Sequence, residues 1–232
     1  MAEPTFDESV SHRRVDIDRW DEVYVVGDVH GCRAELERLL DTLGVTADDL
    51  VVFVGDLVRK GPDSAGVVSL VRESENMLTV RGNNEEKLIR GDKQLPELSD
   101  EQMAWIRDLP VAISWEGTLV VHGGVDPRTN LVDHTVEELE NNRSLSDGSY
   151  ERPFWWEEYA GPDRVFFGHT VLAEPVVREY AVGLDTGCVY GGELTAYDWR
   201  NDEFVAVEAE ETVEERSDSK IVSPRTATSH SD

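Results

Sequence analysis

The stretch EVYVVGDVHG, residues 22–31, decides how the chain folds. EVYVV is a short apolar run rich in β-branched and aromatic residues, which is typical of a buried strand, and Gly27 follows it. Asp28 and His30 lie two residues apart, so in an extended segment both side chains leave the backbone in the same direction. A carboxylate and an imidazole at a strand end form half of a transition-metal site, the alternative being a loop cap beside a surface histidine.

The same pattern, an apolar run that ends in a metal-capable residue next to a glycine, occurs four more times. The runs are VVFVGD, LTVRGNN, TLVVHGG and RVFFGHT, and their polar residues are Asp56, Asn83, His122 and His169. In open α/β sheets ligands bind at the carboxyl edge of the strands. Taken alone, each of these histidines is better explained as a hydrogen-bonded core residue. The repetition predicts instead that all of these side chains share one site.

Composition indicates one soluble domain. With 232 residues, of which 39% are hydrophobic, the chain can bury a full core. No stretch is long and apolar enough to cross a membrane, and MAEPTFDESV has no signal-peptide features, so we expect a cytoplasmic protein. Cys32 and Cys188 are too few for a disulfide framework. Cys32 is expected to be an ordinary reduced thiol, with an additional thiolate ligand beside the first motif as the alternative.

The charge of the chain excludes some classes of partner. Its formal net charge is −27, from 49 acidic and 22 basic residues, which disfavours nucleic-acid polymers and membrane surfaces as partners. The acidic residues are spread along the whole chain. Such repulsion is tolerable where salt screens it, since the Debye length falls to about 3 Å at 1 M. We therefore predict a salt-rich, halophilic cytoplasm; ordinary acidic solubility is the alternative.

Hydrophobic periodicity predicts an α/β fold. Leu36, Leu39, Leu40 and Leu43 form the apolar stripe of a helix over 33–43, and strands are expected at 50–54 and 77–81 with helices at 65–73 and 85–90. This βαβαβ order is typical of a largely parallel sheet. A capping box predicts a further helix after Ser99. A hairpin at 111–121 and short strands at 165–167, 176–184, 194–198 and 204–207 suggest a second sheet packed on the first.

Three regions follow from this pattern. Residues 1–21 are predicted to be a loose acidic lead-in, residues 22–208 a single domain, and residues 209–232 a disordered acidic and Ser/Thr-rich tail. Within the domain, residues 126–163 are irregular and are expected to be lid-like. Their aromatic residues are predicted to pack this lid: Phe154, Trp155, Trp156 and Tyr159.

The ordered series GDVHG, GDLVRKGPDS, RGNNE, HGG and FGHT resembles the signature of the calcineurin-like metallophosphoesterases. Within them the chain is most similar to the phosphoprotein-phosphatase branch, and especially to its diadenosine tetraphosphatase-type members, the symmetrical bis(5'-nucleosyl)-tetraphosphatase-like group. The similarity runs from about Val23 to Ala196 and includes DTGCVYGGELTA at 185–196. It implies a two-sheet α/β sandwich flanked by helices.

By this resemblance the chain binds two divalent metal ions, either Mn, Fe or Zn. Asp28 and His30 would hold the first ion and Asp56 would bridge both, with the second ion held by Asn83, His122 and His169. Such a pair readies water for in-line attack on phosphorus without a covalent intermediate. The implied substrate is a phosphorylated small molecule, with a phosphoprotein as the alternative.

The chain departs from the family pattern at three positions. Where the family has an aspartate, an arginine and a histidine, this sequence has Arg59, Lys60 and Asn84. In the family the histidine protonates the leaving oxygen, which the amide of Asn84 cannot do. A phosphoanhydride has a weakly basic leaving group that departs without a proton, and Arg59 and Lys60 could stabilise its charge. The sequence thus favours dinucleoside polyphosphates or other nucleotides, with Asp56, Arg59, Lys60 and Asn84 as catalytic candidates, although Arg59 and Lys60 could also form a solvated turn.

Two other functions remain open at this point. A serine/threonine protein phosphatase could use Glu85 or His134 as its acid, and a metal-binding pseudophosphatase would serve as a binding module. The residue that grips the substrate is expected within 126–163, where Arg128, Arg143 and Arg152 are candidates. The sequence carries no signal for the native metal or for the oligomeric state.

Overall fold

Strand β2 (Val23–Val26), formed by the decisive stretch, lies at the centre of a five-stranded sheet. The computed structural model describes residues 4–146 and 150–224. β3 (Leu50–Phe53) and β4 (Met77–Thr79) continue this sheet in parallel beyond β2, as predicted. On the other side β10 (Glu193–Asp198) pairs antiparallel with β2, and β11 (Glu203–Glu208) pairs antiparallel with β10. These two strands were expected in the second sheet; they lie in the first because β10 covers the edge that β2 would otherwise expose.

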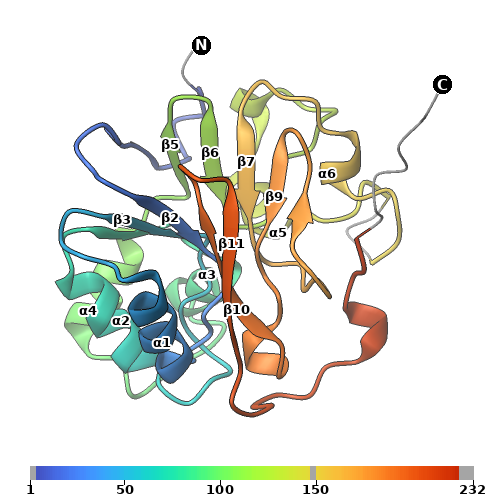
Figure 1. The fold of residues 1–232 in the computed structure, drawn as a ribbon. Coiled ribbons are helices and arrows are strands. Elements are labelled where there is room, and N and C mark those ends of the chain that lie inside the picture. Colours follow the sequence, from blue (N-terminus) through green and yellow to red (C-terminus); the bar gives the residue numbers. More distant parts are fainter. Residues whose placement is uncertain (1–3, 147–149, 225–232) are drawn as a thin grey trace.

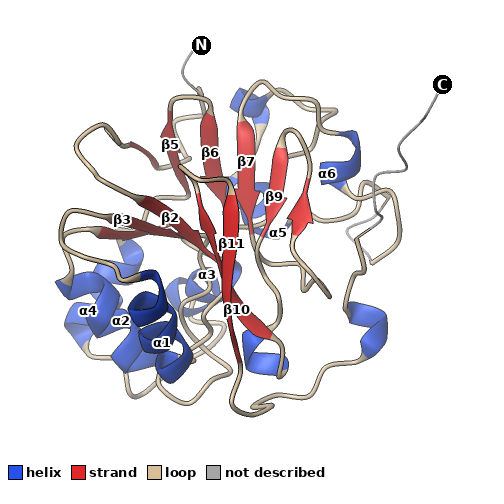
Figure 2. Cartoon of the chain, in the orientation of Figure 1, coloured by secondary structure: helices blue, strands red, loops and turns tan. Residues whose placement is uncertain are grey.

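Helices cover the outer face of this first sheet, as Figure 2 shows. They are α1 (Arg33–Leu43), α2 (Ser64–Glu73), α3 (Asn83–Ile89) and α4 (Asp100–Arg107). The predicted apolar stripe of α1 is buried through Leu36 and Leu39, and Gly44 ends the helix in the left-handed conformation. Ser99 and Gln102 form the predicted capping box of α4. The βαβαβ prediction is therefore confirmed, with boundaries shifted by one or two residues.

The second sheet has the strand order β1-β5-β6-β7-β9-β8 and packs face to face on the first (Figure 1). Its strands are β1 (His12–Arg14), β5 (Ala112–Trp115), β6 (Thr118–Val121), β7 (Arg164–Phe167), β8 (Val176–Val177) and β9 (Ala181–Gly183). β5 and β6 form the predicted hairpin. The single strand predicted at 176–184 is instead the antiparallel pair β8 and β9, because the chain turns between them.

Alternation along β2 explains the layered core. Val23 and Val25 face the second sheet and pack with Val120 and Phe166. Tyr24 and Val26 face the opposite way, toward the helices. Both faces of the strand are therefore buried, which is why EVYVV is apolar without interruption. The observed architecture is the two-sheet α/β sandwich flanked by helices that the sequence predicts.

The region 126–163 covers the outer face of the second sheet. It contains η1 (Leu131–Asp133), α5 (Val136–Asn141) and α6 (Trp155–Glu158). Trp155 and Trp156 are buried, and their rings pack on Phe167 of β7 with centroids 4.7 and 4.9 Å away. Together with Phe154 they form part of a core cluster, so here the aromatic residues hold this region onto the sheet.

Both terminal segments differ from the prediction. β1 lies within the expected loose lead-in and pairs in parallel with β5, using backbone hydrogen bonds that leave no hydrophobic pattern. Residues 209–224, expected in a disordered tail, run back along the molecule and include η3 (Asp218–Lys220). Val222 is buried and bridges to Leu172. The prediction for 225–232 falls outside the described residues.

No helix within 4–146 or 150–224 has the length and apolar character needed to cross a bilayer.

Candidate metal centre

The predicted ligands lie where strands of both sheets end. Asp28 and His30 follow β2, and Asp56 follows β3. His122 directly follows β6 and His169 follows β7 in the second sheet. Carboxyl ends of parallel strands meet at one edge of a sheet, and the two sheets present these edges to each other. The site is thus built across the sandwich.

Four of these side chains converge closely. His30 Nε2 lies 3.8 Å from Asp28 Oδ2 and 3.6 Å from Asp56 Oδ2. His122 Nε2 lies 3.4 Å from Asp56 Oδ2. One ligand atom from each of Asp28, Asp56 and His122 lies within 4.8 Å of the others. The His169 ring is 5.2 Å from the His122 ring, centroid to centroid.

Backbone carbonyls orient the rings of His30 and His122 in a way that suits metal binding. His122 Nδ1 donates to the carbonyl of Val54 at 2.8 Å, and His30 Nδ1 donates to the carbonyl of Val58 at 3.2 Å. Nε2 of each ring therefore points toward Asp56. Burial lowers the pKa of His122, but the charges of Asp56 and Asp28 outweigh it and raise this pKa to about 10, so a metal would displace a proton from His122 Nε2. His122 Nε2 is buried and has no hydrogen-bond partner among the described residues. Histidine ligands commonly donate their other nitrogen to a carbonyl in this way. This donor set of imidazole and carboxylate fits divalent Mn, Fe or Zn.

The electrostatics of the ligands also suits a cation. Burial and the charge of Lys60 lower the pKa of His30 to about 3, and burial with Arg143 lowers that of His169 well below its usual value. Both rings are therefore neutral, the form that binds metals. Burial raises the pKa of Asp28, and the nearby carboxylate of Asp185 adds to this effect. Such crowded buried carboxylates are relieved by a bound cation.

The backbone around the candidate ligands is strained. His30, Asp56 and His169 have φ values of 49°, 52° and 64°, in the left-handed region that these residue types rarely adopt. Hydrogen bonds hold this conformation, among them His30 N to the carbonyl of Asp56 at 2.8 Å. Residues held in such conformations concentrate at functional sites.

The glycines of the motifs make room for the carboxylates. A Cβ on Gly168 would lie 1.9 Å from Asp28 Oδ1, and a Cβ on Gly82 would lie 2.3 Å from Asp56 Oδ1. Any side chain at either position would displace a predicted ligand. The glycines next to the polar residues therefore belong to the site.

Asn84, which follows the predicted ligand Asn83, hydrogen-bonds directly to Asp56. Asn84 is buried, its backbone N–H donates to Asp56 Oδ1 at 2.8 Å, and its side-chain amide donates to Asp56 Oδ2 and to Asn83 Oδ1. Arg59 donates to Asn84 Oδ1. Asn83 is half-buried and donates to Asn141. The role of Asn83 as a ligand remains a prediction, whereas Asn84 connects Arg59 to Asp56.

Cationic side chains line the site. Lys60 Nζ lies 2.6 Å from His30 Nε2, and Arg143 Nη2 lies 2.7 Å from His169 Nε2. Arg59 and Lys60 are only partly exposed, so they do not form a solvated turn. The charges of Asp56 and Asp185 keep the pKa of Lys60 raised although burial opposes this. Positive charge thus already gathers beside the nitrogens that a metal would use.

Tyrosine rings from distant segments of the chain pack against Lys60 and Arg143. Lys60 Nζ lies 5.2 Å from the ring centroid of Tyr190, and Arg143 Cζ lies 4.3 Å from that of Tyr150. Arg216 donates to both hydroxyls, at 2.9 and 2.7 Å. Sequence reasoning did not single out Tyr150 or Arg216, since neither periodicity nor a motif marks them, and Tyr190 entered only as part of DTGCVYGGELTA. Asp185 was quoted only within DTGCVYGGELTA.

The remaining candidates have structural roles. His134 is buried, accepts Asp126 N–H at Nε2 and contacts the carbonyl of Asn130 through Nδ1, so both ring nitrogens are used. The carboxylate of Glu85 accepts backbone N–H groups of Asp56, Val58 and Gly82. Neither residue faces the site as a proton donor.

Of the three candidate gripping arginines, the structure places one in the site. Arg128 pairs with Asp126 and the carbonyl of Leu145, and Arg152 pairs with Glu157 and the carbonyl of Ser223. Arg143 contacts the predicted ligand His169.

The chain matches one family model and is similar to two named relatives and one solved structure. The family model described as calcineurin-like phosphoesterase matches residues 22–192. The asymmetrical bis(5'-nucleosyl)-tetraphosphatase PrpE of Halalkalibacterium halodurans is 32% identical over an alignment of 228 residues, gaps included. The match covers 79% of this chain and 92% of the relative. Serine/threonine-protein phosphatase 1 of Salmonella typhimurium is 29% identical over 209 residues, covering 79% and 94%. A solved structure with the provisional assignment of diadenosine tetraphosphatase superposes with a TM-score of 0.78 at 30% identity, covering 86% of this chain and 98% of that one.

Proposed function

Because the chain belongs to the calcineurin-like phosphoesterase family, we propose that this hydrolase cleaves phosphoanhydride bonds, with dinucleoside polyphosphates or nucleotides as substrates. The family resemblance of the five motifs is confirmed, and family members are metal-dependent phosphatases. The substrate and the role of each residue in binding and catalysis remain proposals. The similarity to a named tetraphosphatase supports the substrate class.

We assign Asp28, His30 and Asp56 to one metal ion and Asp56, Asn83, His122 and His169 to the other. When bound, two divalent cations lower the pKa of water and neutralise charge on the phosphoryl group. The hydrogen bonds from Asn84 orient Asp56, and the carbonyls of Val54 and Val58 fix the two rings. The resident metal is proposed to be Mn, with Fe and Zn as the alternatives that the same donors accept.

Lys60 and Arg143 are proposed to bind the phosphoryl oxygens. Each now donates to an imidazole nitrogen that the ligand assignment gives to a metal. Both side chains are long, so with the metals bound they can turn toward substrate. A planar guanidinium suits bidentate contacts with phosphate, and an ammonium adds a mobile point charge. Polyphosphates, which carry several adjacent charges, suit this set of cations.

The contacts of Asn84 are the main support for proposing a phosphoanhydride substrate instead of a phosphate ester. It lies between Arg59 and Asp56, at the motif position where the resemblance implies a proton-donating histidine. Without an acid, an alkoxide leaves slowly, since general acid catalysis is typically worth about 10²–10⁴-fold. A nucleotide leaving from an anhydride needs no proton, and Arg59 can stabilise its charge.

A competition between two substrates tests this proposal. The Mn-loaded protein is assayed with diadenosine tetraphosphate and with a phosphoserine peptide, and kcat/KM is compared. We expect the anhydride to be preferred. Product analysis separates symmetrical cleavage into two ADP from asymmetrical cleavage into ATP and AMP. Chelated protein and the Asp56→Asn variant serve as inactive controls.

Faster release of phosphate from the peptide would favour the second candidate function, a serine/threonine protein phosphatase. The similarity to the Salmonella phosphatase supports this candidate.

A cytoplasmic location is also proposed, supported by the acidic, lysine-poor composition, and fractionation of the source cells would test it.

A further inference from the structure

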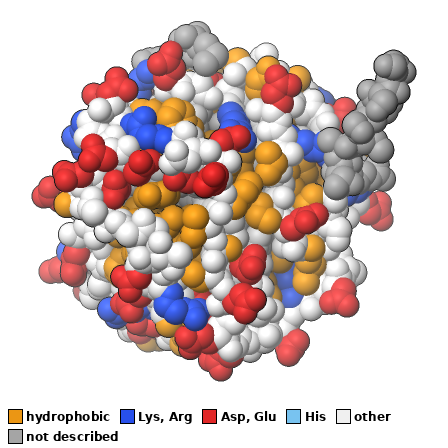
Figure 3. Space-filling model, in the orientation of Figure 1, with side chains coloured by type: hydrophobic (Ala, Val, Ile, Leu, Met, Phe, Trp, Pro, Cys, Tyr) orange, Lys and Arg blue, Asp and Glu red, His pale blue; other side chains and the backbone are white. Residues whose placement is uncertain are grey.

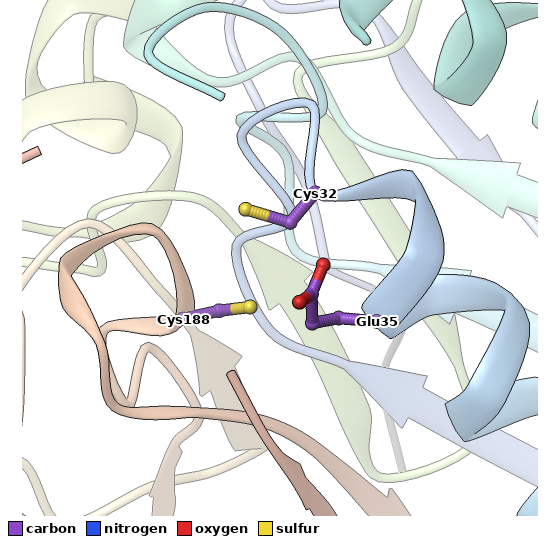
Figure 4. A group of neighbouring side chains, drawn as sticks. All are labelled: Cys32, Glu35 and Cys188. Carbon is purple, nitrogen blue, oxygen red and sulfur yellow. The ribbon is translucent and has the colours of Figure 1, made fainter. Parts of the chain in front are cut away.

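The two cysteines of the chain meet outside the metal centre. Cys32 precedes α1, Glu35 lies in its first turn, and Cys188 begins η2 (Cys188–Tyr190), more than a hundred and fifty residues later in the sequence. One ligand atom from each of the three residues lies within 4.8 Å of the others. Figure 4 shows the three side chains approaching one another from α1 and from the loop at Cys188.

The surroundings of these residues favour coordination. Both cysteines are free and only 2% exposed, and the Glu35 side chain is 12% exposed. Two thiolates with one carboxylate form a set that Zn²⁺ binds well, and zinc sites with three protein ligands take a water as the fourth. The spacing of the donor atoms is compatible with metal–sulfur bonds of about 2.3 Å and metal–oxygen bonds of about 2.1 Å.

Glu35 also lines a cavity of about 540 Å³, whereas Cys32 and Cys188 are buried and are not among the lining residues. Glu35 lines it together with Glu37, Asp63, Glu210 and Glu211, and among the residues that the structure describes Arg33 is the one basic residue of the lining. This excess of carboxylates attracts cations toward Glu35. Glu35 Oε1 also accepts the backbone N–H of Glu210 at 3.2 Å and lies 3.6 Å from Arg38, contacts that orient the carboxylate.

We propose that Cys32, Glu35 and Cys188 form a binding site for one thiophilic divalent cation of the Zn²⁺ class. On binding, each thiol releases its proton to solvent, and two metal–sulfur bonds and one metal–oxygen bond form. The ion joins the loop of Asp28 and His30 to the loop that follows Asp185. This site is separate from the proposed dinuclear centre and does not depend on the substrate assignment.

Cadmium tests the site directly in the unmodified protein. Cys32 and Cys188 are the only cysteines of the chain, so a sulfur-to-cadmium charge-transfer absorption can arise only there. The ligands proposed for the dinuclear centre are nitrogen and oxygen and give no such band. We expect the reduced, metal-free protein to develop the band and the band to saturate at the intensity of one two-thiolate site per monomer, whatever the dinuclear centre takes up, and Zn²⁺ to abolish it by competition.

Matched variants define the ligands. Cys32→Ser and Cys188→Ser should each remove most of the band, and Glu35→Gln should weaken Cd²⁺ binding at least about tenfold. Glu37→Gln, which changes an exposed carboxylate of the same cavity, should bind as the wild type does. Should the serine variants fail to fold, the wild-type titration and the two glutamine variants still decide.

Three results would overturn the site. The first is a wild-type titration without a charge-transfer band. The second is Glu35→Gln binding Cd²⁺ as tightly as Glu37→Gln does. The third is a disulfide between Cys32 and Cys188 that forms in air equally fast with and without saturating Zn²⁺, since coordinated sulfurs are protected from oxidation.

Discussion

Arg59 and Asn84 act as a pair. Arg59 donates to Asn84 Oδ1, and Asn84 in turn donates to Asp56. The resemblance places an aspartate and a histidine at these positions, which would form a different pair, an acid oriented by a carboxylate. Changing one member alone would leave a guanidinium beside an imidazole or an aspartate beside an amide. The pairing explains why both departures occur together.

Restoring the acid pair should shift substrate preference. In Arg59→Asp/Asn84→His we expect kcat/KM for a phosphoserine peptide, relative to diadenosine tetraphosphate, to rise at least about tenfold, because the leaving alkoxide gains a proton donor. Steady-state kinetics on both substrates measures this ratio. Arg72→Asp, a surface arginine paired with Glu101, is the control. An unchanged ratio would mean that leaving-group protonation does not set the preference.

Gly168 offers a test of the metal centre. Its substitution by alanine places a methyl group against Asp28 Oδ1, where the side chains of Asp28 and Val54 leave no room. We expect Gly168→Ala to lose bound metal and most activity, measured as metals per chain and kcat. Gly91→Ala, at a position with open space, is strained because Gly91 has a φ of 77°, but it should keep its metal. Full metal occupancy in Gly168→Ala would argue against Asp28 as a ligand.

At this scale the sequence predicts only part of the site. Asp28, His30, Asp56 and His122 come together because each follows a buried strand, a pattern visible in the sequence. Arg143, Tyr150 and Arg216 meet only in the folded chain, and their segments lack the periodicity that would place them. Their contribution depends on tertiary packing, which one sequence does not reveal.

Among the elements, the segment 209–224 has a role beyond covering the surface. Through Arg216 it ties Tyr190, which contacts Lys60, to Tyr150, which contacts Arg143. We expect Arg216→Ala to raise KM for diadenosine tetraphosphate about tenfold, as expected for loss of about 1.4 kcal/mol of binding, with a smaller change in kcat. Arg200→Ala, which loses bonds to the carbonyls of Ile17 and Trp20, is the matched control. Equal KM values in the two variants would contradict this role.

Helix α5 carries a buried acid that should make stability depend on pH. Burial raises the pKa of Glu140 to about 7, although Arg81 opposes this. The unfolded side chain titrates near its ordinary value of about 4.3. The folded state therefore holds the proton more tightly, and this stabilisation is complete below that value and disappears as the pH rises through 7.

Replacing this acid should flatten the pH profile. Between about pH 5 and about pH 8 we expect the wild type to lose roughly 2 kcal/mol more unfolding free energy than Glu140→Gln does. Urea denaturation at several pH values measures the difference. Glu137→Gln, on the exposed side of the same helix, should follow the wild type. If the unfolding free energy of the wild type and of Glu140→Gln changed equally with pH, Arg81 would be keeping Glu140 ionised.

The elements predicted correctly are those with side-chain signals. The leucine stripe and Gly44 define α1, and the capping box defines α4. β1 was missed because it is a short polar edge strand, and its backbone pairing with β5 and the contact of His12 with Ser114 leave no hydrophobic pattern in the sequence. β10 was assigned to the wrong sheet because alternation shows that a strand exists but does not show which strand it pairs with.

For the whole molecule, charge is the dominant property. Figure 3 shows carboxylates scattered over the visible face with fewer basic groups between them, in keeping with the net charge of −27. Self-repulsion of this size destabilises the compact state unless counterions screen it. The salt-rich habitat predicted from composition thus has a measurable consequence.

Salt should raise the melting temperature. Between about 0.1 and about 2 M KCl, beyond which screening changes little, we expect Tm to rise by at least about 4 °C, which corresponds to roughly 1–2 kcal/mol. Differential scanning calorimetry measures this shift. Repeating the series closer to the pI of about 4.4 is the control, because the gain should shrink as the net charge falls. A flat Tm at neutral pH would leave ordinary acidic solubility as the explanation.

The position of β10 affects how the protein is made. β2, which carries Asp28 and His30 at its end, pairs with β3 on one side and with β10 on the other. A ribosome releases residues 193–198 only after nearly all of the second sheet has emerged. Until then the nascent chain exposes one edge of the apolar strand β2. Translation speed and chaperone supply should therefore govern the yield of active enzyme more than the stability of the finished fold does.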